Sequence, residues 1–241
     1  MNSTKKAARV AGLVYLLAAL PGPFVLLYIP GKIIVRGDAA ATAHNILASE
    51  SLFRIGIAGE MITAAAFLLV PLALYRLLAG VNKSQATLMV ILFAVSVPIS
   101  FMNAVNSIAA RTLVRGENFL SVFDQPQREA LAMLFLRLHS QGFVAAQIFW
   151  GLWLLPFGLL VYRSRFLPRV LGVWLIVNCF AYLADSLTSL LWPAYAHGVS
   201  QVTLVPKFGE VAVMFWLLIM GAKELPLEAG AVGLQTNAAS E

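Results

Sequence analysis

The sequence predicts an all-α membrane protein: a bundle of six transmembrane helices with one short additional helix at the outer membrane surface. Of the 241 residues, 60% are hydrophobic and only 12% are charged, whereas a soluble domain carries about 25% charged residues. The mean hydropathy is +0.83. The apolar residues gather into stretches that reach the ~20 helical residues needed to cross a hydrocarbon core. Lipid is therefore the expected solvent for most of the chain.

The six predicted spans form one membrane domain over residues 1–223. They are expected at residues 10–30, 55–79, 86–112, 128–163, 169–192 and 204–222. The remaining residues, 224–241, are rich in Ala and Gly and lack apolar periodicity. This composition predicts a disordered tail on the cytoplasmic side.

The first span follows basic residues, as the apolar core of a secretory signal peptide does. Its apolar stretch continues to Tyr28, which is longer than the usual core of a signal peptide, and no clear cleavage motif closes it. We therefore expect an uncleaved span. Pro21 and Pro23 lie inside it, and they should kink the helix or end it early because proline cannot donate a backbone hydrogen bond.

A short helix is expected after the first span, on the outer side. Asp38 precedes the segment 39–48, and an aspartate at this position can accept a hydrogen bond from a free N–H of the first helical turn. The segment is too short to cross a bilayer. It should therefore lie at the membrane surface.

The fourth span is expected to begin well outside the membrane. Residues 124–127 have the sequence Asp-Gln-Pro-Gln, which matches a capping box with proline in the first turn. A helix over residues 125–163 would be roughly 58 Å long, nearly twice a hydrocarbon core of ~30 Å. It should project outward by several turns or bend at Gly142 or Pro156.

The charged residues indicate the orientation of the spans. The formal net charge is +6, but the basic residues cluster between apolar stretches, where they determine topology and contact anionic lipid. The segment 163–169 is short and basic, whereas segments on the opposite side are longer and also carry acids. We predict a multi-pass protein of the cytoplasmic membrane with both termini inside. Because no nucleic-acid-binding motif is present, the expected partner is membrane lipid and not nucleic acid.

Three carboxylates, Glu60, Asp185 and Glu210, interrupt the apolar spans. A charged side chain in mid-membrane costs about 2.5–3.5 kcal/mol on insertion scales, so each needs a partner or water. Counted along the predicted spans, all three lie toward the outer side, as does His139. This shared depth predicts an outward-facing polar pocket between the helices. Its expected lining residues and counter-ions are Glu60, Asn103, Arg111, His139, Asp185, Glu210 and Arg54.

Polar residues recur at helical spacing on one face of two spans, which supports such a pocket. In the third span they are Ser96, Ser100, Asn103, Ser107 and Arg111, and in the fifth they are Asn178, Tyr182, Asp185 and Ser189. Around Glu60, small residues would let another helix approach closely. Each polar group also has a purely structural interpretation, because a carboxylate can serve as a bridge between helices and His139 as a satisfied interfacial histidine.

Common catalytic motifs are absent: there is no H-E-x-x-H, no G-x-S-x-G and no glycine-rich phosphate loop. The favoured function is binding or transport of a small-molecule or lipid-like ligand, in which Arg54 and Arg111 hold an anionic group. One alternative is an intramembrane lipid-modifying enzyme that uses His139 with a carboxylate as acid and base. Another alternative is a non-catalytic accessory or signalling subunit.

No cofactor is expected, and the sequence leaves the oligomeric state and any catalytic residues open. Cys179 is the single cysteine, so an internal disulfide is excluded. A metal site could combine the three histidines with the carboxylates of the spans, but no spacing of these residues supports one.

Several short sequences occur in a fixed order along the chain. They are GDAAATA (37–43), NILASE (45–50), LFR (52–54), LHSQG (138–142), FLPRVLG (166–172), YLADS (182–186) and GE (209–210). In this order they resemble the bacterial integral-membrane family called domain of unknown function 4386, over about residues 6–223. The resemblance implies a six-span membrane protein and no particular reaction. It also implies that Glu60 stands where relatives often have aspartate, and that the residues typical of the family include Asp38, Arg54, His139, Asp185 and Glu210.

Overall fold

The computed structural model describes residues 3–223, and every regular element in this range is a helix. Six helical segments are long and apolar enough to cross a membrane. They are Thr4–Ile33, Glu50–Leu78, Lys83–Arg115, Gln125–Arg163, Arg169–Leu191 and Pro193–Ile219. The predicted all-α fold with six membrane spans is confirmed. The tail expected at residues 224–241 lies outside the described residues.

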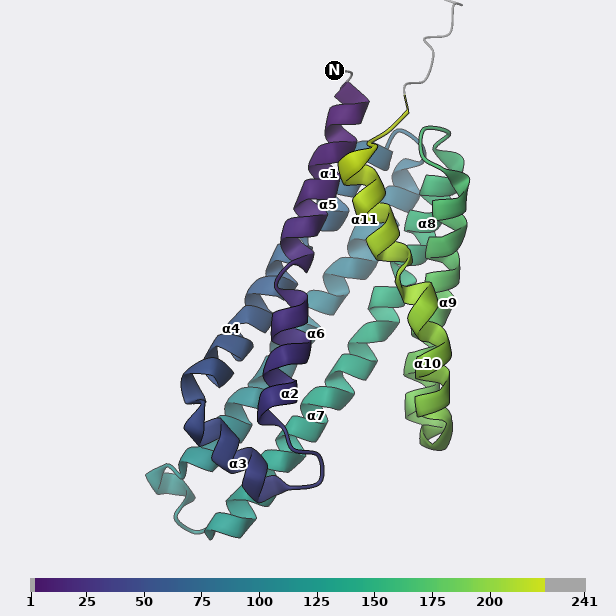
Figure 1. Cartoon of the computed structure of the whole chain (residues 1–241). Coiled ribbons are helices and arrows are strands. Elements are labelled where there is room, and N and C mark those ends of the chain that lie inside the picture. Colours follow the sequence, from purple (N-terminus) through teal and green to yellow (C-terminus); the bar gives the residue numbers. More distant parts are fainter. Residues whose placement is uncertain (1–2, 224–241) are drawn as a thin grey trace, which may run out of the picture.

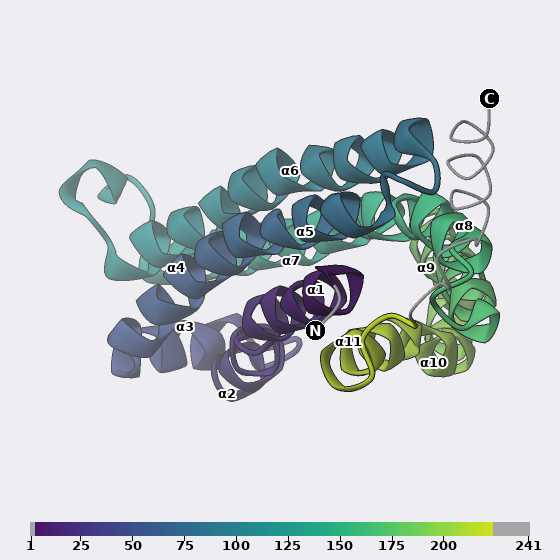
Figure 2. The ribbon, with the colours of Figure 1, turned by 90° about the horizontal axis from the view of Figure 1, so that it is seen from above.

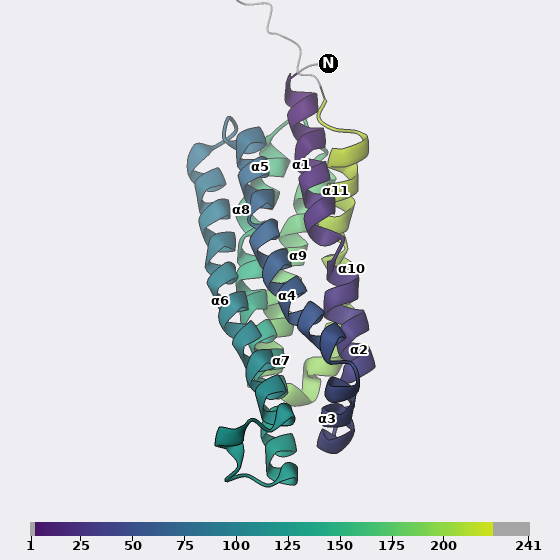
Figure 3. The same cartoon turned by 90° about the vertical axis from the view of Figure 1, so that its left-hand side faces the viewer.

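Most spans consist of more than one helix. The α-helices are α1 (Ser3–Ala19), α2 (Ile29–Ile33), α3 (Ala39–Ala48), α4 (Glu50–Phe67), α5 (Leu69–Leu78), α6 (Lys83–Arg115), α7 (Gln125–Leu152), α8 (Leu154–Arg163), α9 (Arg169–Leu191), α10 (Ala196–Lys207) and α11 (Gly209–Ile219). A π-helix, Pro23–Tyr28, leads into α2, and 3-10 turns lie at Asn118–Leu120 and Pro193–Tyr195. The spans run side by side, with the start of α1 and the end of α11 at one end of the bundle and α3 at the other (Figures 1 and 3).

Three spans are interrupted four residues before a proline. The helices α1, α4 and α7 end at Ala19, Phe67 and Leu152, and the prolines are Pro23, Pro71 and Pro156. Because proline has no N–H, the carbonyl four residues earlier loses its helical partner, and the proline ring also crowds it. The early end expected for the first helix is confirmed. The fourth span breaks at Trp153, ahead of Pro156, whereas Gly142 lies inside α7.

The two helix starts predicted from Asp38 and from Asp124 are confirmed, whereas the side of the membrane on which they lie stays a prediction. The backbone N–H of Ala41 donates to Oδ1 of Asp38 at 2.8 Å, which caps α3. At the start of α7, the backbone N–H of Gln127 donates to Oδ1 of Asp124 at 2.9 Å. Oε1 of Gln127 accepts from the backbone N–H of Asp124 at 3.1 Å in return. These reciprocal bonds satisfy N–H groups that a helix start leaves free.

The sixth span begins earlier than the expected residue 204. The 3-10 turn Pro193–Tyr195 leads directly into α10, whose first half contains polar residues that lower the local hydropathy. The span breaks at Phe208 and continues as α11. Glu210 therefore lies well inside its span. The expectation that it lies near the outer start of the span was wrong.

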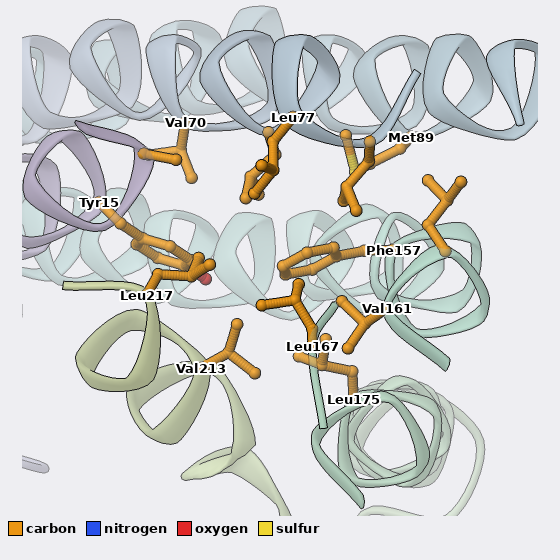
Figure 4. Close-up of a cluster of buried hydrophobic side chains, with 14 of the residues drawn as sticks. Tyr15, Val70, Leu77, Met89, Phe157, Val161, Leu167, Leu175, Val213 and Leu217 are labelled. Atoms are coloured by element: carbon orange, nitrogen blue, oxygen red, sulfur yellow. The ribbon is translucent and has the colours of Figure 1, made fainter. Parts of the chain in front are cut away.

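Two clusters of apolar side chains hold the bundle together. In the larger one, Tyr15, Val70, Met89, Phe157 and Leu217 converge from α1, α5, α6, α8 and α11 (Figure 4). The smaller cluster lies toward the α3 end and joins α2 and α3 to α4, α6 and α7. It includes Ile29, Ile33, Ile46, Phe53, Ala110 and Leu136.

Glycines allow the closest helix contacts. Viewed along the bundle, α1 lies directly beside α11 (Figure 2). At their contact, a Cβ atom on Gly12 would lie 2.5 Å from the backbone nitrogen of Leu218. No side chain can be accommodated at that distance. Gly12 therefore sets the separation of the first and last spans.

Candidate functional site

Two neighbouring cavities lie between the helices. The first, of about 210 Å³, is called here the aromatic cavity, and its lining includes Glu60, Phe67, Phe93, Trp150, Trp153, Tyr182 and Glu210. The second, of about 450 Å³, is called the aliphatic cavity, and its lining includes Val25, Ile29, Ile33, Phe53, Leu136 and His139. The two share Leu26, Glu60, Phe143 and Trp150. The aromatic cavity thus borders the larger apolar cluster and the aliphatic cavity borders the smaller one.

Glu60 stands between the two cavities. Its Oε2 atom lies 2.9 Å from Nε2 of His139, which brings α4 and α7 together. Only 9% of the Glu60 side chain is exposed, and its Oε1 atom has no hydrogen-bond partner among residues 3–223. Asn103 supports the pair from α6, because its Nδ2 donates to the backbone carbonyl of His139 at 2.9 Å.

Small residues let the first span approach Glu60. A Cβ atom on Gly59 would lie 2.8 Å from the side chain of Val25, and one on Gly56 would lie 3.1 Å from that of Ile29. This agrees with the close helix approach expected from the small residues around Glu60. Gly142 has the corresponding role between α6 and α7, where its missing side chain leaves room for Asn103.

Glu210 lines the aromatic cavity from α11. It lies in the first turn of α11, directly after the break at Phe208. The free N–H groups and the positive end of the helix dipole at such a start favour a carboxylate. The hydroxyl of Tyr15, buried on α1, donates to Oε2 of Glu210 at 2.6 Å. A neutral donor and a helix start therefore hold this carboxylate inside the bundle.

Asp185 forms a separate ion pair beside the cavities. Nζ of Lys207 lies 2.6 Å from its Oδ2 and 5.1 Å from the ring centre of Tyr182. The pair joins α9 to the last residue of α10, just before the break in the sixth span. Trp174 also secures this break, because its Nε1 donates to the carbonyl of Pro206 at 3.1 Å. Oδ1 of Asp185 has no partner among the described residues.

The two arginines of the expected pocket lie outside both cavities. Nε of Arg111 donates to Oε1 of Glu50 at 2.8 Å, and Arg115 lies 3.6 Å from the same oxygen. Arg54 is exposed. The structure therefore brings Glu60, His139 and Asn103 together, and Glu210 lines a cavity that Glu60 also lines.

The sequence-based prediction of the pocket did not include four residues that contact its members or line its cavities: Tyr15, Glu50, Trp150 and Lys207. Lys207 lies inside the predicted span 204–222 but was counted with the charges of the outer side, although its position three residues before Glu210 was a usable signal. For Tyr15, no feature of the sequence indicates the contact with Glu210, which is 195 positions away.

Within residues 3–223, no group of three or more His, Cys, Asp or Glu side chains lies close enough to hold a metal ion. His139 is paired with Glu60, and the exposed His197 has its Nε2 3.1 Å from Nε2 of Gln201.

Comparison with known proteins identifies the family of this chain but does not identify an activity. An uncharacterised protein of Archaeoglobus fulgidus is 38% identical over 76 residues, which make up 32% of this chain and 44% of that protein. The chain thus matches less than half of this relative's length. No solved structure matches it. The family model described as "Domain of unknown function (DUF4386)" matches residues 10–221, and the chain therefore belongs to that family.

Proposed function

We propose that this membrane protein binds a small amphipathic or lipid-like ligand between its helices and moves it across part of the membrane. The observation that carries the proposal is the Oε1 atom of Glu60, which is buried without a partner at a position that lines both cavities. A buried carboxylate oxygen without a hydrogen bond is costly. A polar group of a ligand in either cavity would satisfy it.

The two cavities suit the two parts of an amphipathic molecule. The aliphatic cavity is lined mainly by Val, Ile, Leu and Phe side chains and accepts an apolar chain. Glu60 and His139 at its wall offer a polar contact for the other end. Leu26, Phe143 and Trp150 line both cavities, so a longer ligand can extend from one into the other.

The interrupted helices support movement of the ligand. Phe67 and Trp153 lie at the breaks of the second and fourth spans, and both line the aromatic cavity. Glu210 follows the break of the sixth span and lines the same cavity. Breaks in spanning helices are tolerated where they border a cavity or pack against protein, and transporters place their binding sites at such breaks.

The distribution of charge favours an outward opening of the aliphatic cavity. The end of the bundle that holds residues 3 and 223 carries basic side chains and, within residues 3–223, no acidic ones. These basic residues are Lys5, Lys6, Arg9, Arg76, Lys83, Arg163, Arg165, Arg169 and Lys223. By the positive-inside rule this end faces the cytoplasm. The α3 end, whose apolar cluster borders the aliphatic cavity, then faces outward.

Quenching of Trp150 tests the proposal. Purified protein is titrated with a dodecyl maltoside brominated on its chain, because bromine quenches only tryptophans that it approaches closely. We expect a saturable component of quenching that Trp150→Phe removes. Trp192→Phe should lower only the unsaturable quenching that comes from detergent around the protein, since Trp192 is 59% exposed and lies outside both cavities. Ser107→Leu, which fills the wall of the aliphatic cavity, should remove the saturable part. Quenching that rises without saturation in the wild-type protein as well as in Ser107→Leu would contradict ligand binding.

One observation favours a second function, an intramembrane lipid-modifying enzyme. The 2.9 Å contact between Nε2 of His139 and Oε2 of Glu60 is the arrangement in which a carboxylate orients a histidine base. This function requires the wild-type protein to release a product from labelled phospholipid, and His139→Asn to abolish that release. An accessory subunit with purely structural polar contacts is less well supported, because Glu60 and Asp185 each keep an unpaired oxygen.

A further inference from the structure

The geometry of the aromatic cavity points to a ligand class that the sequence did not indicate. We infer that this cavity binds a compact organic cation, a quaternary ammonium or protonated amine, between Glu60 and Glu210. The inference rests on the proposed function and specifies the chemistry of the ligand's polar end. It replaces the earlier expectation of an anionic group held by Arg54 and Arg111.

The charged residues that line the aromatic cavity are both acidic. Glu60 and Glu210 approach the cavity from α4 and α11, and no Lys or Arg lines it among the described residues. The nearest lysine in the sequence, Lys207, is paired with Asp185. Carboxylates in a low-dielectric site without a fixed counter-ion favour a positive ligand and repel a negative one.

The partners of these two carboxylates leave room for that ligand. His139 contacts Oε2 of Glu60 and lines only the aliphatic cavity, so no charged partner of Glu60 lines the aromatic cavity, and Oε1 is buried without a partner among the described residues. Glu210 accepts a hydrogen bond from the Tyr15 hydroxyl and has Tyr182 and Asn178 as further hydrogen-bond partners, and none of these neutral groups brings a positive charge. A ligand cation would therefore add the compensating charge that the wall of the cavity lacks.

Aromatic rings supply the second recognition element. The cavity is lined by the rings of Phe67, Phe93, Phe143, Trp150 and Trp153, and by Tyr182, whose ring already has the Lys207 ammonium 5.1 Å from its centre. Faces of aromatic rings attract cations electrostatically, and such rings recognise quaternary ammonium groups in proteins. Phe93 and Trp153 are fixed edge to face, with ring centres 5.2 Å apart, so this part of the wall is already ordered.

The remaining polar atoms of the wall are suited to a cation as well. The hydroxyl of Ser96 donates to the carbonyl of Phe93 at 2.7 Å, and that of Ser100 donates to the carbonyl of Ser96 at 3.1 Å. A hydroxyl whose proton is used in this way offers only lone pairs to a ligand. The volume of about 210 Å³ limits the charged group to a compact one.

A pair of probes that differ only in charge tests this inference. Choline and 3,3-dimethylbutan-1-ol have the same shape, but the second carries carbon in place of the charged nitrogen. In calorimetric titration of the purified full chain, we expect choline to bind about tenfold or more tightly than the alcohol. Glu210→Gln should remove this preference. Glu50→Gln, the same substitution at a carboxylate outside both cavities, should leave it intact.

Each outcome separates this inference from the proposed function. Equal binding of both probes would overturn the cation site and leave a ligand-binding cavity standing. Binding of neither probe would also overturn it, and the quenching of Trp150 would then decide the proposed function independently. The comparison of probes in the wild-type protein needs no variant. If Glu210→Gln fails to fold, Trp150→Leu should still reduce the preference for choline, because Trp150 contributes a ring to the cavity.

Discussion

Gly12→Leu is expected to prevent the bundle from reaching its native packing. A Cβ atom at this position would lie 2.5 Å from the backbone nitrogen of Leu218 and 2.9 Å from the backbone carbonyl carbon of Leu217. Backbone cannot move aside as the end of a flexible side chain can, so α1 and α11 must separate. Overpacking of this kind costs about 1–3 kcal/mol and more where the structure cannot relax. The separation would also pull Tyr15 away from Glu210.

The measurement is the yield of monodisperse protein in size-exclusion chromatography, followed by the midpoint of thermal unfolding. Gly31→Leu is the matched control, because a Cβ atom on Gly31 meets nothing within 4 Å. We expect native yield and midpoint for Gly31→Leu and a severe loss of both for Gly12→Leu. Equal midpoints for the two variants would show that the contact between the first and last spans is looser than described.

Lys207→Met is expected to lower the free energy of unfolding by about 3–5 kcal/mol, because it leaves a buried carboxylate without its partner. Asp185 is only 6% exposed, and its Oδ1 atom already lacks a hydrogen bond. The double variant Asp185→Leu/Lys207→Met removes both charges. It should recover most of the loss, since apolar replacement of a whole buried pair is often neutral.

A double-mutant cycle in mixed detergent micelles measures this coupling. Arg115→Met serves as the exposed control: Arg115 lies 3.6 Å from Glu50 with 48% of its side chain exposed, so its loss should cost about 1 kcal/mol or less. A double variant as unstable as Lys207→Met alone would show that the loss does not come from an unpaired Asp185 carboxylate.

Local features of the chain were predictable from sequence because their physics is local. The caps at Asp38 and Asp124 depend on residues three positions away, and the early end of α1 depends on Pro23. The break at Leu68 follows the same rule through Pro71 and could have been predicted. These features need no knowledge of how the spans pack.

The partners of the polar groups were not predictable, because they depend on how each helix is rotated and tilted against its neighbours. Arg111 could pair with any carboxylate near its end of the bundle, and only the packing of α4 against α6 selects Glu50. Glu210 lies deeper than expected because the polar first half of α10 concealed the start of its span. A single polar layer was therefore expected, whereas the structure contains two carboxylates across a cavity and a separate ion pair beside it.

The most direct test of this account is the side-specific modification of a cysteine in the aromatic cavity. Ser100→Cys lines that cavity, and Cys179→Ser removes the only native thiol. Intact cells are treated with 2-(trimethylammonium)ethyl methanethiosulfonate or with its anionic sulfonatoethyl counterpart, neither of which crosses membranes. Ile108→Cys provides the control on the exposed apolar surface.

We expect the cationic reagent to modify Ser100→Cys faster than the anionic one, and both to leave Ile108→Cys unmodified because lipid keeps its thiol protonated. Choline should protect Ser100→Cys. That result would place an acidic cavity at Glu60 and Glu210 that is reached from outside through the neighbouring aliphatic cavity. Failure of both reagents to modify Ser100→Cys, or faster modification by the anionic one, would contradict it.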